Sequence, residues 1–173
     1  MCSRRIEAIH ETIFEGSRPF GYFGWPTVAK LPDGTLAAGA SGFRSSHICP
    51  FGKTVLWTSP DEGRSWSDPV IVNDSLIDDR DVGLCPLPDG SLLISHFSSD
   101  TRLYYPKGAP MPDRTDFRPV LDAWEDGSVA RYLGSFLRRR LPDGSFGPQI
   151  PVAVSSPHGP TLLRDGSLLY VGT

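Results

Sequence analysis

The segment Asp78-Asp79-Arg80-Asp81 is the densest group of chemically useful side chains in the sequence. On a β-strand, alternation would direct Asp79 and Asp81 to one side and Arg80 to the other. Two carboxylates at this spacing can share a proton, shift each other's pKa or bind sugar hydroxyls. We therefore take Asp79 and Asp81 as candidate catalytic residues and Arg80 as a candidate substrate-binding residue. The alternative is a solvated loop with an Asp–Arg ion pair.

Four more side chains are suited to catalysis or substrate binding. Arg44 can bind a carboxylate through two parallel hydrogen bonds, and His47 can exchange a proton near neutral pH. His158 lies in Ser-Pro-His-Gly-Pro, where Gly159 and Pro160 restrict the backbone. Trp25 can stack on a sugar ring. The structural alternatives are a surface position for Arg44, a capping role for His47, a turn-stabilising role for His158 and a core position for Trp25.

A repeated hairpin predicts how these residues are positioned. Segments 31–40, 87–96 and 163–172 each begin with a Pro-Asp-Gly or Arg-Asp-Gly turn and continue as an apolar strand. In such turns proline presets φ and glycine takes the left-handed position. A second hairpin type, at 55–72 and more weakly at 136–154, alternates with the first. Four antiparallel strands per unit are typical of a β-propeller blade.

The expected fold is all-β: a β-propeller with four-stranded blades, of which the chain holds about two and a half. It would form a single partial domain over residues 1–173. We expect a contribution to the outer strand of the closing blade at 4–15, blade 1 at 23–75, blade 2 at 80–154 with an inserted loop at 98–127, and the start of blade 3 at 156–173. Within the insert, residues 116–125 suit one short helix.

The stretch Ser59 to Trp66 has two interpretations. Asp61 could bind a metal ion or act in catalysis, or it could accept backbone N–H groups and lock the turn, with Gly63 in the left-handed position and Trp66 folded back. We favour the turn lock. Up-and-down threading then puts all short turns on one face and the irregular loops on the other, where function is expected.

The residues Ser59-Pro-Asp61-Glu-Gly63-Arg-Ser65-Trp66 match the Asp-box pattern S-x-D-x-G-x-[ST]-W. With the alternating hairpins, residues 23–173 resemble the sialidase-like (BNR/Asp-box) six-bladed propellers. The resemblance implies an incomplete ring in this chain and a substrate site opposite the Asp-boxes. It also implies a glycoside hydrolase that removes a terminal sugar such as sialic acid.

The sequence departs from this family at informative positions. The family's Phe-Arg-Ile-Pro motif is Phe23-Gly24-Trp25-Pro26 here, so glycine replaces its first arginine. His47 is the titratable group nearest to the place of the family's acid aspartate, and the nucleophilic tyrosine would belong to later blades. Two alternatives to an enzyme follow: a non-catalytic glycan- or protein-binding propeller, and an inactive portion of a larger enzyme.

Composition limits the remaining classes. A net charge of −3 argues against a nucleic-acid partner, and no apolar run approaches the roughly 20 residues of a membrane span. With no signal-peptide pattern at the start, we expect a cytoplasmic protein. The three cysteines lack zinc-ligand spacing, and we expect no metal or cofactor. The expected partners are a carbohydrate and further blades or a second copy that completes the ring.

Overall fold

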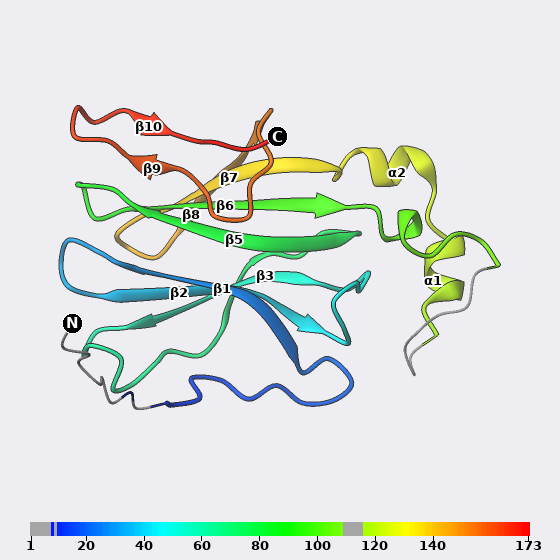
Figure 1. Cartoon of the computed structure of the whole chain (residues 1–173), viewed down its shortest axis with the longest axis horizontal. Coiled ribbons are helices and arrows are strands. Elements are labelled where there is room, and N and C mark those ends of the chain that lie inside the picture. The colour runs from blue at the N-terminus through cyan, green and yellow to red at the C-terminus, as the bar shows by residue number, and fades with distance from the viewer. Residues whose placement is uncertain (1–7, 9, 109–115) are drawn as a thin grey trace, which may run out of the picture.

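The structure, a computed structural model, describes residues 8, 10–108 and 116–173. It is built of antiparallel β-sheets (Figure 1). The first sheet has the order β1 (Tyr22–Lys30), β2 (Leu36–Arg44), β3 (Lys53–Ser59) and β4 (Val70–Asn73). The second has the order β5 (Asp78–Pro86), β6 (Leu92–Ser99), β7 (Gly134–Arg140) and β8 (Phe146–Val152). Strands β9 (Thr161–Leu162) and β10 (Leu168–Leu169) form a two-stranded sheet. The all-β class and the four-stranded antiparallel sheets are confirmed.

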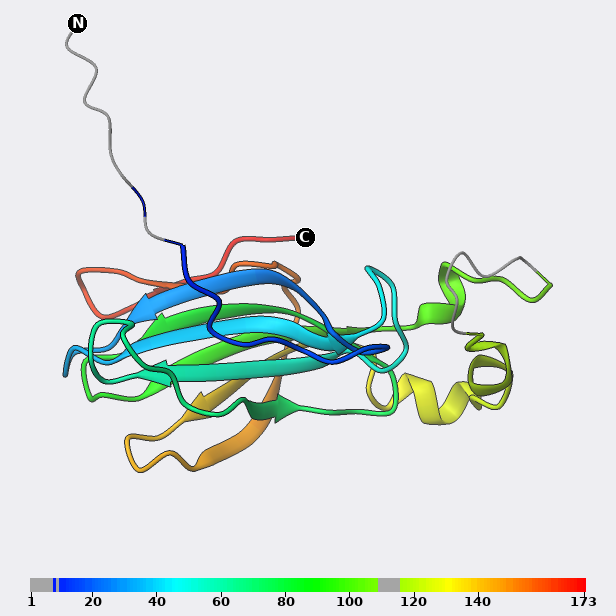
Figure 2. The ribbon, with the colours of Figure 1, turned by 90° about the horizontal axis from the view of Figure 1, so that it is seen from below.

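The two large sheets pack against each other, and β5 contacts β1, β2 and β3 (Figure 2). Apolar side chains from both sheets form the shared core. Its buried members are Leu31, Ala37, Leu56, Val72, Val82, Leu84, Leu92 and Ile94. Burial of this apolar surface is the main force that holds the sheets together.

The third hairpin touches the second sheet through a glycine contact. A Cβ atom on Gly83 would lie 2.4 Å from the backbone nitrogen of Gly159 and 2.3 Å from the Ser95 hydroxyl. Those distances are far below van der Waals contact, so only glycine lets the two backbones approach here. This approach brings the His158 segment next to β5.

The short turns and the long loops lie at opposite ends of the sheets (Figure 1). The turns β1–β2, β5–β6 and β9–β10 share one local bond, in which Asp33, Asp89 and Asp165 accept the N–H two residues later. The β2–β3 loop and the helical insert lie at the other end. The predicted division into a face of short turns and a face of irregular loops is therefore observed.

Asp61 is the centre of a turn lock, as predicted. Its carboxylate accepts from the Ser59 hydroxyl at 2.9 Å, the Ser65 N–H at 2.9 Å and the Ser65 hydroxyl at 2.6 Å. These bonds, led by the Ser65 hydroxyl, lower the pKa of Asp61 to about 2. The Trp66 indole folds back and donates to the Gly63 carbonyl at 3.1 Å. The carboxylate is thus occupied within its own turn.

The insert between β6 and β7 contains more helix than its sequence predicts. It comprises the 3-10 helix η1 (Thr101–Leu103) and the helices α1 (Arg118–Asp122) and α2 (Asp126–Ala130). Helix α1 falls within the predicted range, but α2 was missed because Gly127 and Ser128 are weak helix formers. Burial of Val129 stabilises α2 instead. None of the helices in the described residues has the length and hydrophobicity needed to cross a membrane.

The expected outer strand at 4–15 is not seen in the part that can be judged. Residues 4–7 and 9 lie outside the described residues, and residues 10–15 form no strand. Instead Phe14 packs edge-on against Phe23 and Phe43, at 5.2 and 5.9 Å between ring centroids. A strand needs a neighbouring strand edge, whereas this segment is held through an aromatic side chain.

The turn lock predicts a graded loss of stability. We expect Asp61→Ala to lower the midpoint of thermal unfolding more than Asp33→Ala, because Asp61 connects residues on both sides of its turn. Circular dichroism melts of the two variants and the parent chain measure the difference. Equal shifts would show that Asp61 does no more than an ordinary turn aspartate.

Candidate functional site

A buried ion pair joins the two large sheets at the end that carries the β2–β3 loop and the helical insert, which is called the loop end. Arg44, the last residue of β2, donates to both carboxylate oxygens of Asp78, the first residue of β5, at 2.7 and 2.9 Å. Both side chains are fully buried. Burial raises the pKa of Asp78, and the Arg44 guanidinium opposes that shift. The pair fixes the end of β5 against the first sheet.

The remaining donors of Arg44 are also used inside the protein. They reach the carbonyls of Ser46, His47 and Asp79 at 3.3, 2.9 and 3.3 Å. A Cβ atom on Gly52 would lie 2.0 Å from the guanidinium, so glycine is required beside the pair. Arg44 does bind a carboxylate in bidentate fashion, but the carboxylate belongs to Asp78. This corrects the expectation that Arg44 contacts substrate.

Next to the ion pair, the first strand of each large sheet has one non-glycine residue with a positive φ angle, and the two residues occupy equivalent positions in the 56-residue repeat. Trp25 in β1 and Asp81 in β5, 56 residues apart like Asp33 and Asp89, have φ angles of 52° and 47°. The strand register shifts at both places. Non-glycine residues with positive φ are uncommon, and such strain concentrates at functional sites. The strained pair therefore marks the candidate site.

Arg80 lies between aromatic rings at this site. Its guanidinium carbon is 4.9 Å from the centroid of the Trp25 ring and 6.0 Å from that of Phe97. One terminal nitrogen lies 3.4 Å from His47 Nε2, and the other lies 3.5 Å from Asp78. The Nε atom is buried and has no hydrogen-bond partner among the described residues. Arg80 thus keeps an unused donor.

Asp81 keeps an unused acceptor. Its carboxylate is almost fully buried, and Oδ1 has no hydrogen-bond partner in the described part of the chain. Burial raises the pKa of Asp81, while the charges of Arg80, Arg44, His158 and His47 oppose the shift. The backbone N–H of Asp81 donates to the Ser41 hydroxyl at 2.8 Å. The structure therefore brings Trp25, His47, Arg80, Asp81 and His158 into one neighbourhood.

Asp79 belongs to a different environment. It is fully buried and accepts from the Ser75 N–H at 2.6 Å, the Ser75 hydroxyl at 2.9 Å and the Ser98 hydroxyl at 2.5 Å. Burial raises its pKa to about 6. The positive φ of Asp81 breaks the alternation that would have directed both carboxylates to one side. Asp79 and Asp81 thus have different hydrogen-bond partners, and their joint action in catalysis stays a prediction.

The side chains gathered around Arg80 and Asp81 are suited to binding an anionic ligand and to proton transfer. A carboxyl with a raised pKa can hold a proton for a leaving group, and a guanidinium fixed between rings can bind an anionic oxygen. His47 and His158 are exposed and are free to contact a ligand. In the described residues no cluster of three histidine, cysteine or carboxylate side chains is arranged to hold a metal ion.

Sequence reasoning missed Asp78, Ser41, Ser98 and Phe97 as parts of this region. Asp78 belongs to the segment that was singled out, but nothing local identifies it as the partner of Arg44. The others lie opposite or beside β5 only after strands pair. The 56-residue repeat aligns Trp25 with Asp81, which were already candidates, and it does not identify these four residues.

Comparison with known proteins bears on the fold. No family model matches the chain, and no curated protein sequence matches it. Among solved structures, it is similar to a crystal structure of a protein of unknown function from Dyadobacter fermentans DSM 18053, with a TM-score of 0.59 and 16% identity. The match covers 91% of this chain and 48% of that chain. The chain therefore spans about half the length of this structural neighbour.

The buried ion pair predicts non-additive mutant stabilities. Arg44→Met and Asp78→Leu should each cost about 3–5 kcal/mol, because each leaves an uncompensated buried charge. The double variant should lose less than either single variant, since both charges are then removed. Urea unfolding measures all three, and Lys53→Met, which breaks the partly exposed pair with Asp74, is the control. Additive losses in the double variant would contradict this account.

The raised pKa of Asp79 predicts that this residue makes the stability of the protein depend on pH. Its folded pKa lies above the ordinary value of 3.8, so the folded state retains a proton that the unfolded state releases. The contribution of Asp79 to the free energy of unfolding should therefore fall between pH 4 and about 6, by an amount on the order of 3 kcal/mol. Burial lowers the pKa of His96 to about 4, which contributes a rise over much of the same range, so the difference in free energy of unfolding between the parent chain and Asp79→Asn isolates the Asp79 part. That difference should change over this pH range, and the difference between the parent chain and Asp143→Asn, at an exposed turn, should not. Urea titrations at several pH values test it, and an unchanged profile in Asp79→Asn would contradict it.

Proposed function

We propose that this chain is part of a sialidase-like β-propeller and acts on a carbohydrate at the loop end of its sheets. The proposal for the fold is supported by two consecutive four-stranded antiparallel sheets and a third hairpin. The Asp-box lock at the opposite end supports it further. The neighbour of twice the length is compatible with further blades that this chain does not contain.

The proposed reaction is hydrolysis of a terminal acidic sugar, such as a sialoside. One observation carries it: Asp81 and Arg80 are adjacent, at least nine-tenths buried, and each keeps an unpartnered polar atom. Leaving buried polar atoms without partners costs free energy, so a ligand that satisfies them gains affinity. A sugar acid offers a carboxylate for Arg80 and hydroxyl or glycosidic oxygens for Asp81.

Each neighbouring side chain has a role in this proposal. Asp81, with its raised pKa, protonates the departing oxygen. Arg80 binds the sugar carboxylate and supplies the charge that Gly24 cannot provide at the family's first arginine position. Trp25 holds the Arg80 guanidinium and borders the sugar ring. His47 and His158 donate hydrogen bonds to sugar oxygens.

A specific observation also favours glycan binding without hydrolysis. Glycoside hydrolysis ordinarily uses two carboxyl groups on either side of the bond. Among the described residues near Arg80, Asp78 is bound by Arg44 and Asp79 by two serines, so Asp81 alone has a free oxygen. The second group would have to come from outside these residues. Without it, the site would bind a glycan and leave it intact.

Binding and hydrolysis separate the two possibilities. We expect N-acetylneuraminic acid to quench tryptophan fluorescence, with affinity about tenfold weaker in Arg80→Lys, because lysine cannot form the planar contact with a carboxylate. If the chain is hydrolytic, Asp81→Asn should abolish release from an aryl sialoside while binding persists, since asparagine cannot supply the proton. Parent hydrolysis should also decline as pH rises above the raised pKa of Asp81.

Asp143→Asn, at an exposed turn on the opposite face, is the matched control. Binding that is unchanged in both Arg80→Lys and Asp81→Asn would reject this site. Binding without turnover of any glycoside in a panel of sialosides, glucuronides and neutral sugars would favour the glycan-binding alternative.

A further inference from the structure

The insert between β6 and β7 forms a small module with a core of its own. Tyr105, Phe117, Leu121, Trp124 and Val129 bury their side chains together with Cys49 and Ile77, which belong to neighbouring loops of the sheets. The Tyr105 hydroxyl also reaches the Ile48 carbonyl at 3.4 Å. The module is therefore anchored to the sheets.

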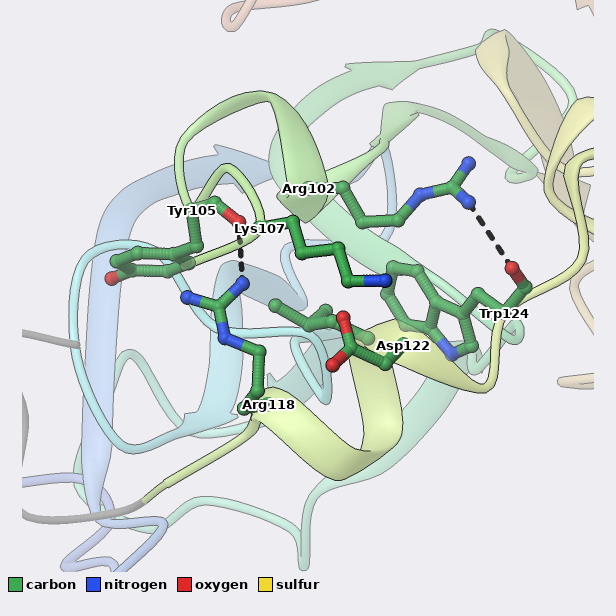
Figure 3. Close-up of a pocket in the computed structure, with 7 residues that line it drawn as sticks. Arg102, Tyr105, Lys107, Arg118, Asp122 and Trp124 are labelled. Carbon is green, nitrogen blue, oxygen red and sulfur yellow. Dashed lines mark hydrogen bonds between the residues drawn. The ribbon is translucent and has the colours of Figure 1, made fainter. Parts of the chain in front are cut away.

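This module contains a pocket that is separate from the candidate site (Figure 3). The cavity has a volume of about 270 Å³. Its lining residues are Arg102, Tyr105, Lys107, Arg118, Leu121, Asp122 and Trp124. Pockets for drug-sized ligands start near 300 Å³, so this one suits a single sugar-sized molecule.

Two arginines in the pocket wall are held in place by internal contacts. Arg102 pairs with Asp100 at 2.7 Å and with Asp126 at 2.9 Å, and it also donates to the Trp124 carbonyl at 3.1 Å. Arg118 donates to the carbonyls of Tyr105 and Pro106 at 3.0 and 3.1 Å (Figure 3). These contacts orient both guanidinium groups before any ligand arrives, which lowers the cost of binding.

Lys107 differs from the two arginines. Its side chain is exposed, and Nζ forms no hydrogen bond or ion pair with any residue in the described ranges. In Figure 3 the side chain extends across the pocket between the Trp124 ring and the Asp122 carboxylate. Lys107 is thus a cationic side chain of the lining that no described acid pairs with, whereas Arg102 is already paired with Asp100 and Asp126.

We propose that this pocket is a second ligand site, for a small hydroxylated carboxylate such as a sugar acid. The ligand's carboxylate binds Lys107, and its hydroxyl groups donate to Asp122. Sulfate satisfies only the first requirement, because it offers Asp122 no donor. A neutral sugar satisfies only the second. The site does not depend on hydrolysis at Asp81.

The test is a titration of the whole chain with sodium glucuronate, followed through the indole N–H resonance of Trp124. Trp124→Phe assigns this signal among the four tryptophans. We expect the Trp124 resonance to shift on binding, and Lys107→Gln to weaken that binding about tenfold through loss of a charge-assisted contact. Lys30→Gln, at another exposed lysine, should leave the titration unchanged.

Glucose and sulfate serve as the comparison probes. The proposal requires both to bind at least about tenfold more weakly than glucuronate. It is overturned if either probe matches glucuronate, if Lys107→Gln titrates like the parent chain, or if the Trp124 resonance does not move. Asp81→Asn should leave this titration intact, so the second site and the proposed hydrolytic site can fail separately.

Discussion

The geometry of the loop end depends on the buried pair between Arg44 and Asp78. Two fully desolvated charges are favourable only when their hydrogen bonds are complete, and here both carboxylate oxygens and three carbonyls accept from one guanidinium. The pair joins the end of β2 to the start of β5, so it sets where the next residues of β5 lie. Gly52 leaves the space that the guanidinium occupies.

From that fixed point, strain and incomplete hydrogen bonding increase along β5. Asp79 is satisfied by serines, Arg80 keeps one unused donor, and Asp81 combines a positive φ with an unused acceptor. A stable core can tolerate these costs because the two sheets bury a continuous apolar cluster beneath them. The apolar core thus supports an end of the sheets where buried polar atoms of Arg80 and Asp81 lack hydrogen-bond partners among the described residues.

Much of the fold was predictable because its signals are local. Pro-Asp-Gly turns and alternating strands depend on residues a few positions apart, and the Asp61 lock closes within one turn. Helix α2 was not predictable in this way, because Gly127 and Ser128 disfavour a helix and burial of Val129 decides the outcome. Within the predicted range 4–15, residues 10–15 form no strand, and contacts of Phe14 with other rings hold that segment.

The sequence by itself determined the strand pattern, the repeat and the set of residues from which a site could be built. Only the tertiary structure decided how those residues divide their roles. Arg44 was expected to hold a ligand but holds Asp78, and Asp79 and Asp81, which were expected on one side of a strand, have different hydrogen-bond partners. The reason is physical: a side chain's role depends on which partners satisfy it, and Asp78, the partner of Arg44, and Ser98, a partner of Asp79, lie on strands 34 and 19 residues away in the chain.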